Sequence, residues 1–216
     1  MKRGLGFALA VVLTAVVVGV AAGPVRAAGA VAFDRCNPRM ADDYSGQIRD
    51  FEAHPVRGGA NDMFKRLQAI NDVLTAVNQE RGVIDGVCST QAQKAPIFAQ
   101  LAATAAWGLG LQSDVLLQLG QPCPPAGKAM ATALVSQGWL DLATSVNHNG
   151  GTVPEPVAQV VPKLQSRAAA LGLTLPAFAD TSAYWRDGLD TQAKAAMKAC
   201  PTPLPSPAPS AAPSGR

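Results

Sequence analysis

The amino-acid sequence predicts an all-α fold: an antiparallel helical bundle of five to six helices, stapled by two disulfides. Apolar residues recur every three or four positions through most of residues 28–200, which is the period of an α-helix. No segment alternates apolar and polar residues over the length of a β-strand. The connections between the periodic segments are short, as they are between antiparallel neighbours in a helical bundle. These three observations favour the all-α class.

Two helices are predicted before the centre of the chain. The first opens at Asp42–Asp43, where an Asp can cap the amino terminus, and ends at His54, because the residue before a proline avoids helical geometry. The second begins at Asn61, which can cap it. Its apolar stripe starts at Phe64 and keeps the helical phase through Gly82. We therefore expect one continuous helix there, although glycine inside a helix costs about 1 kcal/mol relative to alanine.

The central helix is predicted to follow Ser89–Thr90, either of which can cap it, and to include an uncharged segment between Lys94 and Asp114. Pro96 suits the first turn of a helix, where its missing N–H costs nothing. A helix that is apolar nearly all round must be buried nearly all round. We expect this helix at the centre of the bundle, with Ala and Gly letting its neighbours come close. Its periodic positions are Ile97, Leu101, Thr104, Gly108, Leu111, Val115 and Leu119.

Three more segments follow the central helix. One helix is predicted to start around residues 127–128 and to end at the turn 147–151, where two glycines can adopt positive φ. Prolines at positions 154, 156 and 162 are too dense for an undisturbed helix. They predict a loop or one short turn, followed by a helix over residues 162–171 that ends at Gly172. The last helix is predicted to begin near residues 175–176 and to reach Cys200.

The two ends of the chain are predicted to lie outside the folded domain. A basic start, an uncharged apolar run over residues 5–22 and small residues before position 28 are typical of a secretory signal peptide, residues 1–27. An uncleaved amino-terminal anchor is the alternative. Residues 201–216 are mostly Pro, Ser and Ala, which predicts a disordered tail. The helical bundle domain then comprises residues 28–200, in a secreted or periplasmic protein.

Charge argues against two classes of partner. Removal of Lys2, Arg3 and Arg26 with the signal peptide takes the formal charge from +3 to 0. A neutral chain without a basic cluster has no electrostatic footprint for nucleic acid, or for an anionic membrane after signal cleavage.

Four cysteines in an exported chain predict two disulfides. Three pairings are open, and we favour Cys36–Cys88 with Cys123–Cys200, because each pair would then link helix ends in one half of the bundle. A metal site is the alternative, but the chain has no C-x-x-C motif and only two histidines. We therefore predict no metal and no cofactor.

Few residues are suited to catalysis. His54 is predicted to bond the last carbonyls of a helix, and His148 to lie in a solvated turn; neither has an obvious nucleophile and orienting group beside it. Asp42–Asp43 suit a helix start, and Asp187 and Asp190 share a predicted solvated face. Four aromatic residues remain as candidate contacts with a ligand or partner: Trp107, Trp139, Tyr184 and Trp185.

Three functions are compatible with these features. The first is an exported non-catalytic helical domain, a protein-binding or structural module of the cell envelope or extracellular space. The second is a carrier of a small hydrophobic ligand in a cavity around Trp107 and Trp139. The third, less favoured, is a hydrolase-type enzyme that uses His148 or an aspartate cluster. An enclosed apolar cavity above about 300 Å³ would favour the carrier, and a filled core with an exposed aromatic patch would favour the partner-binding module. Convergence of His54, His148 and a carboxylate would favour the enzyme.

Overall fold

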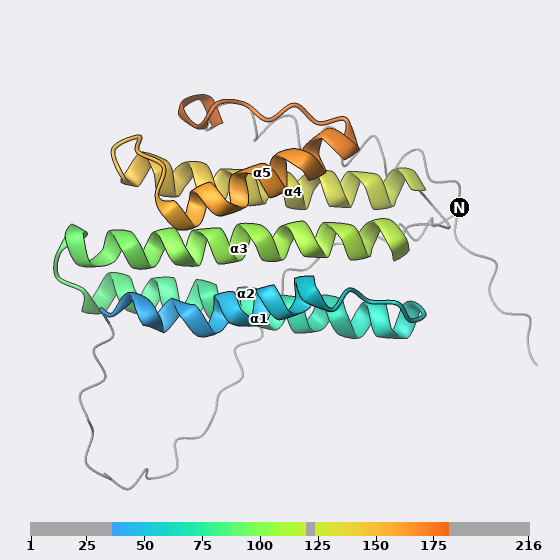
Figure 1. Ribbon diagram of the computed structural model, residues 1–216, viewed down its shortest axis with the longest axis horizontal. Helices are drawn as coiled ribbons and strands as arrows, with labels where there is room; N and C mark the ends of the chain where they lie inside the picture. Colours follow the sequence, from blue (N-terminus) through green and yellow to red (C-terminus); the bar gives the residue numbers. More distant parts are fainter. Residues whose placement is uncertain (1–35, 120–123, 182–216) are drawn as a thin grey trace, which may run out of the picture. The chain divides into compact units, whose positions relative to one another are not determined.

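The computed structural model describes residues 36–119 and 124–181 (Figure 1). This part of the chain holds five α-helices and no strand, which confirms the all-α prediction. The helices are α1 (Asp42–Ala53), α2 (Ala60–Val87), α3 (Gln91–Leu119), α4 (Pro124–His148) and α5 (Glu155–Leu171), with short 3₁₀ helices at Pro38–Ala41 and Phe178–Asp180. The predicted signal peptide, tail and last helix lie outside the described residues.

Helix α3 is the centre of the bundle, as its uncharged segment between Lys94 and Asp114 predicts. It contacts each of the other four α-helices, and Figure 1 shows it between α1 and α2 on one side and α4 and α5 on the other. More than half of its residues are buried, with Ile97, Leu101 and Ala106 fully so. Helix α4 approaches α3 closely at Gly138, where a Cβ atom would lie only 3.0 Å from the backbone oxygen of Ala106. The small residues of this pair therefore serve close packing.

Helix α3 begins directly after Thr90, as predicted, which is one turn earlier than a first-turn position of Pro96 would require. Thr90 and Gln93 form a reciprocal cap: the Gln93 N–H donates to Thr90 Oγ1 at 3.3 Å, and the Thr90 N–H donates to Gln93 Oε1 at 3.2 Å. This capping box satisfies two amide donors at the helix start. Pro96 consequently lies inside the helix, where it removes one internal hydrogen bond, and the prediction of a first-turn position was wrong.

Helix α2 runs through Gly82 without a break, as the apolar phase predicts. Its start differs from the prediction: Gly59 precedes it, and the Gly59 carbonyl accepts from the amides of Asp62 and Met63 at 3.0 and 3.2 Å, so Asn61 is not the cap. Phe64 is 61% exposed and does not belong to the buried stripe. Helix α1 likewise lacks a side-chain cap, because a 3₁₀ turn leads directly into Asp42.

The proline-rich segment after α4 is helical rather than a loop. Helix α5 starts at Glu155, seven residues before the predicted start, and Pro156 lies in its first turn, where proline is tolerated. Pro162 lies in the interior of the helix, so the density of prolines misled the prediction. Gly172 ends α5 with a φ of 72°, and Gly150 and Gly151 also take positive φ; these three predictions are confirmed. Helix α4 begins at Pro124, before the predicted residues 127–128.

One of the two predicted disulfides is present in the described residues. Cys36 and Cys88 are bonded, with their Cα atoms 5.6 Å apart and 52 positions apart in sequence. A loop of this length corresponds to about 4 kcal/mol of stabilisation in the chain-entropy model. The bond ties the segment before α1 to the end of α2. Cys123 and Cys200 lie outside the described residues. Among the described helices, none is both long and apolar enough to cross a membrane.

Candidate functional site

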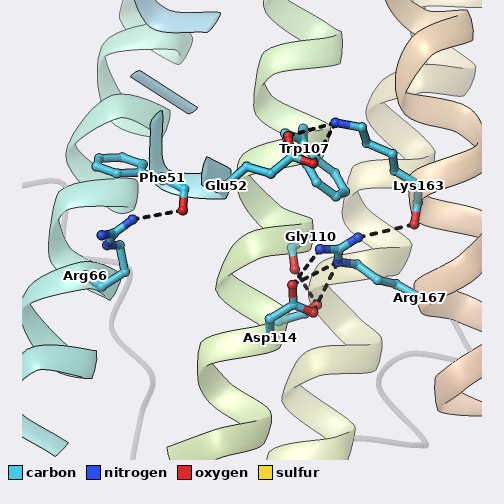
Figure 2. A network of polar contacts seen from close by, with 9 residues as sticks. Phe51, Glu52, Arg66, Trp107, Gly110, Asp114, Lys163 and Arg167 are labelled. Carbon is cyan, nitrogen blue, oxygen red and sulfur yellow. Dashed lines mark hydrogen bonds and ion pairs between the residues drawn. The ribbon is translucent and has the colours of Figure 1, made fainter. Parts of the chain in front are cut away.

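Trp107 is the centre of a polar cluster built by α1, α3 and α5 (Figure 2). Its side chain is only 4% exposed, and its indole N–H donates to Glu52 Oε2 of α1 at 2.8 Å. Lys163 of α5 donates to both oxygens of the same carboxylate, at 2.8 and 2.7 Å. Glu52 thus joins three helices through a single carboxylate.

Two cations of α5 lie against the Trp107 ring. The Lys163 ammonium is 4.4 Å from the ring centroid, and the Arg167 guanidinium carbon is 4.0 Å from it. Arg167 also donates to Asp114 of α3, with Nη2 2.6 Å from Oδ2 and Nε 3.1 Å from each carboxylate oxygen (Figure 2). Each cation is therefore balanced by its own carboxylate, and the arrangement is that of a structural cluster.

Arg66 of α2 caps the carboxyl-terminal end of α1. It donates to the carbonyl oxygens of Phe51 and His54 at 3.1 and 2.9 Å, and its guanidinium lies 4.7 Å from the centroid of the Phe51 ring. His54 Nδ1 lies 3.1 Å from the Asp50 carbonyl oxygen and 3.0 Å from the Asp50 carboxylate. His54 thus has the helix-end role that its position predicts.

The second buried tryptophan is also held by packing. Trp139 of α4 is 4% exposed, stacks on Phe178 with ring centroids 4.4 Å apart, and donates its indole N–H to the Pro176 carbonyl oxygen at 3.0 Å. The recess beside Trp107 has a volume of only about 120 Å³. Trp107 and Trp139 are therefore core residues. Tyr184 and Trp185, the other two aromatic candidates, lie outside the described residues.

A recess of about 200 Å³ lies between α2, α3 and α4. Its charged groups are Arg81 of α2 and Asp141 of α4, whose closest atoms are 3.5 Å apart. Burial raises the pKa of Asp141 above its ordinary value, and the nearby Arg81 and the Gln137 amide only partly offset this. His148 stands in the same wall. Sequence reasoning noticed His148 alone, although Asp141 is the single acidic residue of α4.

A wider cleft opens where α1, α3 and α5 begin. It has a volume of about 580 Å³ and is not enclosed. Its walls carry small or rigid residues from α3 and α5, and Asp42 and Glu155 supply its two carboxylates. The lining residues are Asp42, Ala92, Ala95, Pro96, Ala99, Gln100, Asn149, Pro154, Glu155 and Pro156.

The remaining predicted site residues do not converge. His54 follows α1 and contacts Arg66, whereas His148 ends α4 and lines the recess with Arg81. Figure 1 shows α4 ending beside the start of α3, whereas α1 ends beyond the middle of α3. Within residues 36–119 and 124–181, no three His, Cys, Asp or Glu side chains are grouped to hold a metal ion. Asp187 and Asp190 lie outside the described residues.

Comparison with known proteins does not identify a family for this chain. The chain matches no protein-family model, and neither curated proteins nor solved structures give a significant match. We therefore base the functional proposal on the geometry above.

Proposed function

We propose that this chain is an exported, non-catalytic helical domain that binds a partner protein of the cell envelope or the extracellular space. The observation that carries the proposal is the open cleft of about 580 Å³ at the starts of α1, α3 and α5. An open cleft with small side chains in its walls admits the backbone of an extended segment, whereas a chamber for a free apolar ligand would be enclosed.

The walls of the cleft favour a partner segment with small side chains and a basic group. Ala92, Ala95 and Ala99 keep the α3 wall shallow, and Pro154 and Pro156 make the opposite wall rigid. The carboxylates of Asp42 and Glu155 lie in the first turns of their helices. They could each accept a hydrogen bond from a Lys or Arg of the partner.

The packing of the interior supports this proposal over the carrier. A Cβ atom at Gly108 would lie 2.8 Å from Leu74 Cδ2, and one at Gly138 would lie 3.0 Å from the Ala106 backbone oxygen. The glycines near the two tryptophans thus face protein atoms rather than an empty volume. Export is supported by the Cys36–Cys88 bond, since disulfides persist in oxidising compartments.

Site-specific photo-cross-linking tests the proposal. The full chain would carry a photoreactive side chain at Ala95, in the cleft, or at Ala169, an exposed position on α5 outside the cleft. In cells of the organism that encodes the chain, we expect one partner protein to be cross-linked from position 95 and not from position 169.

A variant that blocks the cleft distinguishes specific binding there from non-specific cross-linking. Ala92→Trp fills the cleft from an exposed position and should abolish the cross-link from position 95, while Ala169→Trp should leave it intact. Equal cross-linking from both positions, or no effect of Ala92→Trp, would contradict the proposal.

A further inference from the structure

The recess between α2, α3 and α4 shares no lining residue with the cleft and, like it, is open to solvent. Its α4 wall consists of positions 141, 144, 145 and 148, which share one face of the helix because they are three or four residues apart. Phe98 and Ala102 of α3 form an apolar wall, and Arg81 comes from α2. The volume of about 200 Å³ is enough for one small molecule and is below the usual range of about 300–1,000 Å³ for drug-sized ligands.

The two opposite charges of the recess are only loosely engaged. Arg81 Nη2 lies 3.5 Å from Asp141 Oδ2, and its Nη1 lies 3.3 Å from Asn78 Oδ1. The Gln137 amide is also 3.5 Å from Asp141. Each of these distances exceeds the usual N–H···O range of about 2.7–3.2 Å. The contrast with Arg167 and Asp114, which approach to 2.6 Å, shows that the fold can form a close pair between helices.

Burial makes this loose pairing unfavourable. The side chain of Asp141 is only 19% exposed and that of Arg81 25% exposed. A carboxylate that has lost most of its water needs several donors, and an arginine has five N–H groups to place. The Ser145 hydroxyl, in a residue only 7% exposed, and the lone pairs of Thr144 Oγ1 add further polar partners in the same wall.

We propose that this recess binds a free α-amino acid with a small apolar side chain. The ammonium group donates to the Asp141 carboxylate, the carboxylate accepts from the Arg81 guanidinium, and the side chain rests on Phe98 and Ala102. An α-amino acid carries its two charges on groups bonded to the same carbon, so it can satisfy both partners of one loosely held pair. His148, exposed at the end of α4, also lines the recess.

Either half of such a ligand fits less well. A simple carboxylic acid would bring its negative charge beside Asp141, and a simple amine would bring its positive charge beside Arg81. Both would be disfavoured by the like charge. The recess therefore discriminates by the presence of both groups and by the size of the apolar part.

Calorimetric titration of the full chain provides the first test, with L-valine, isovalerate and isobutylamine as probes. Isovalerate lacks the ammonium group and isobutylamine lacks the carboxylate, while the apolar part is nearly the same. We expect L-valine to bind at least about tenfold more tightly than either analogue. Isovalerate or isobutylamine binding as tightly as L-valine, or no saturable heat with L-valine at about 10 mM, would overturn the proposal.

Two variants test which side chain binds the ammonium group of the ligand and which binds its carboxylate. In Asp141→Asn, L-valine should bind no better than isovalerate, and in Arg81→Gln it should bind no better than isobutylamine. Lys94→Gln, which removes the Lys94–Asp85 ion pair near the α2–α3 connection, should leave all three affinities unchanged. Asp141→Asn should still bind isovalerate and Arg81→Gln should still bind isobutylamine, whereas a general loss of folded protein would abolish the binding of every probe. An unchanged ratio in both variants would refute the assignment.

Discussion

Charged residues lie beside α3 both where it faces α1 and α5 and where it faces α2 and α4, but the geometry of the ion pairs differs between these two sides. On the side facing α1 and α5, Glu52, Asp114, Lys163 and Arg167 approach to 2.6–2.8 Å around the Trp107 ring. On the side facing α2 and α4, Arg81 and Asp141 stop at 3.5 Å beside a recess. Close pairing satisfies the charges and fixes three helices, whereas loose pairing leaves buried charge available to a ligand. The distance between the charged atoms of an ion pair is therefore a better guide to a ligand site than the number of ion pairs.

Truncation of the aromatic residue on each side should give the largest difference in stability between the two sides. Trp107→Ala removes an indole that is 4% exposed and leaves Glu52 and both cations without it, so we expect a loss of about 3–5 kcal/mol in the free energy of unfolding. Phe98→Ala, at a partly buried position that borders the recess, should cost about half as much. Urea denaturation of both variants measures the difference. Equal losses would mean that the recess side is packed as tightly as the Trp107 side.

Double-mutant cycles sharpen the comparison of the two ion pairs. For Arg167→Ala and Asp114→Ala, we expect a coupling free energy near 1 kcal/mol, the upper end for partly exposed pairs, because the contact is multidentate. For Arg81→Ala and Asp141→Ala, we expect no more than about half of that value, because their one contact, at 3.5 Å, is longer than a usual hydrogen bond. A larger coupling for Arg81 and Asp141 would show that the gap is closed in solution.

Much of the fold could be predicted because it follows from local pattern. The uncharged segment around Trp107 predicted the central helix, Gly172 predicted the end of α5, and the phase through Gly82 predicted a continuous α2. The errors arose where one residue's preference was given too much weight. Pro96 and Pro162 lie inside helices because buried neighbours, including Ile97 and Leu164, outweigh one missing hydrogen bond each.

The candidate sites were much harder to predict because they depend on contacts between distant residues. Glu52 and Lys163 are 111 positions apart, and Arg81 and Asp141 are 60 apart. No periodicity links such pairs. The sequence did contain one signal for each site: a tryptophan in an uncharged segment needs a partner for its N–H, and Asp141 is the single acidic residue of α4. Neither signal names the partner.

The dependence of stability on pH gives the smallest effect and compares Asp141 with Asp85. The pKa of Asp141 is raised by burial above its ordinary value of 3.8, so the folded state holds this proton more tightly than the unfolded state. Ionisation of Asp141 therefore lowers stability as the pH rises from about 3.8 through the folded-state pKa. The Asp141→Asn variant should gain stability relative to the natural protein over that range and keep the gain at neutral pH.

Asp85 should show the opposite sign. The hydrogen bond and charge of Lys94 lower the pKa of this exposed carboxyl, so its ionised form stabilises the fold above pH 3.8, and this contribution disappears as the pH falls through the lowered pKa. Asp85→Asn should then lose stability at neutral pH and regain parity in acid. Thermal unfolding between about pH 2.5 and 7 follows both variants across the relevant window. The same pH trend in both would mean that Arg81 compensates the burial of Asp141 fully, and that the recess holds a satisfied pair with no unmet demand for a ligand.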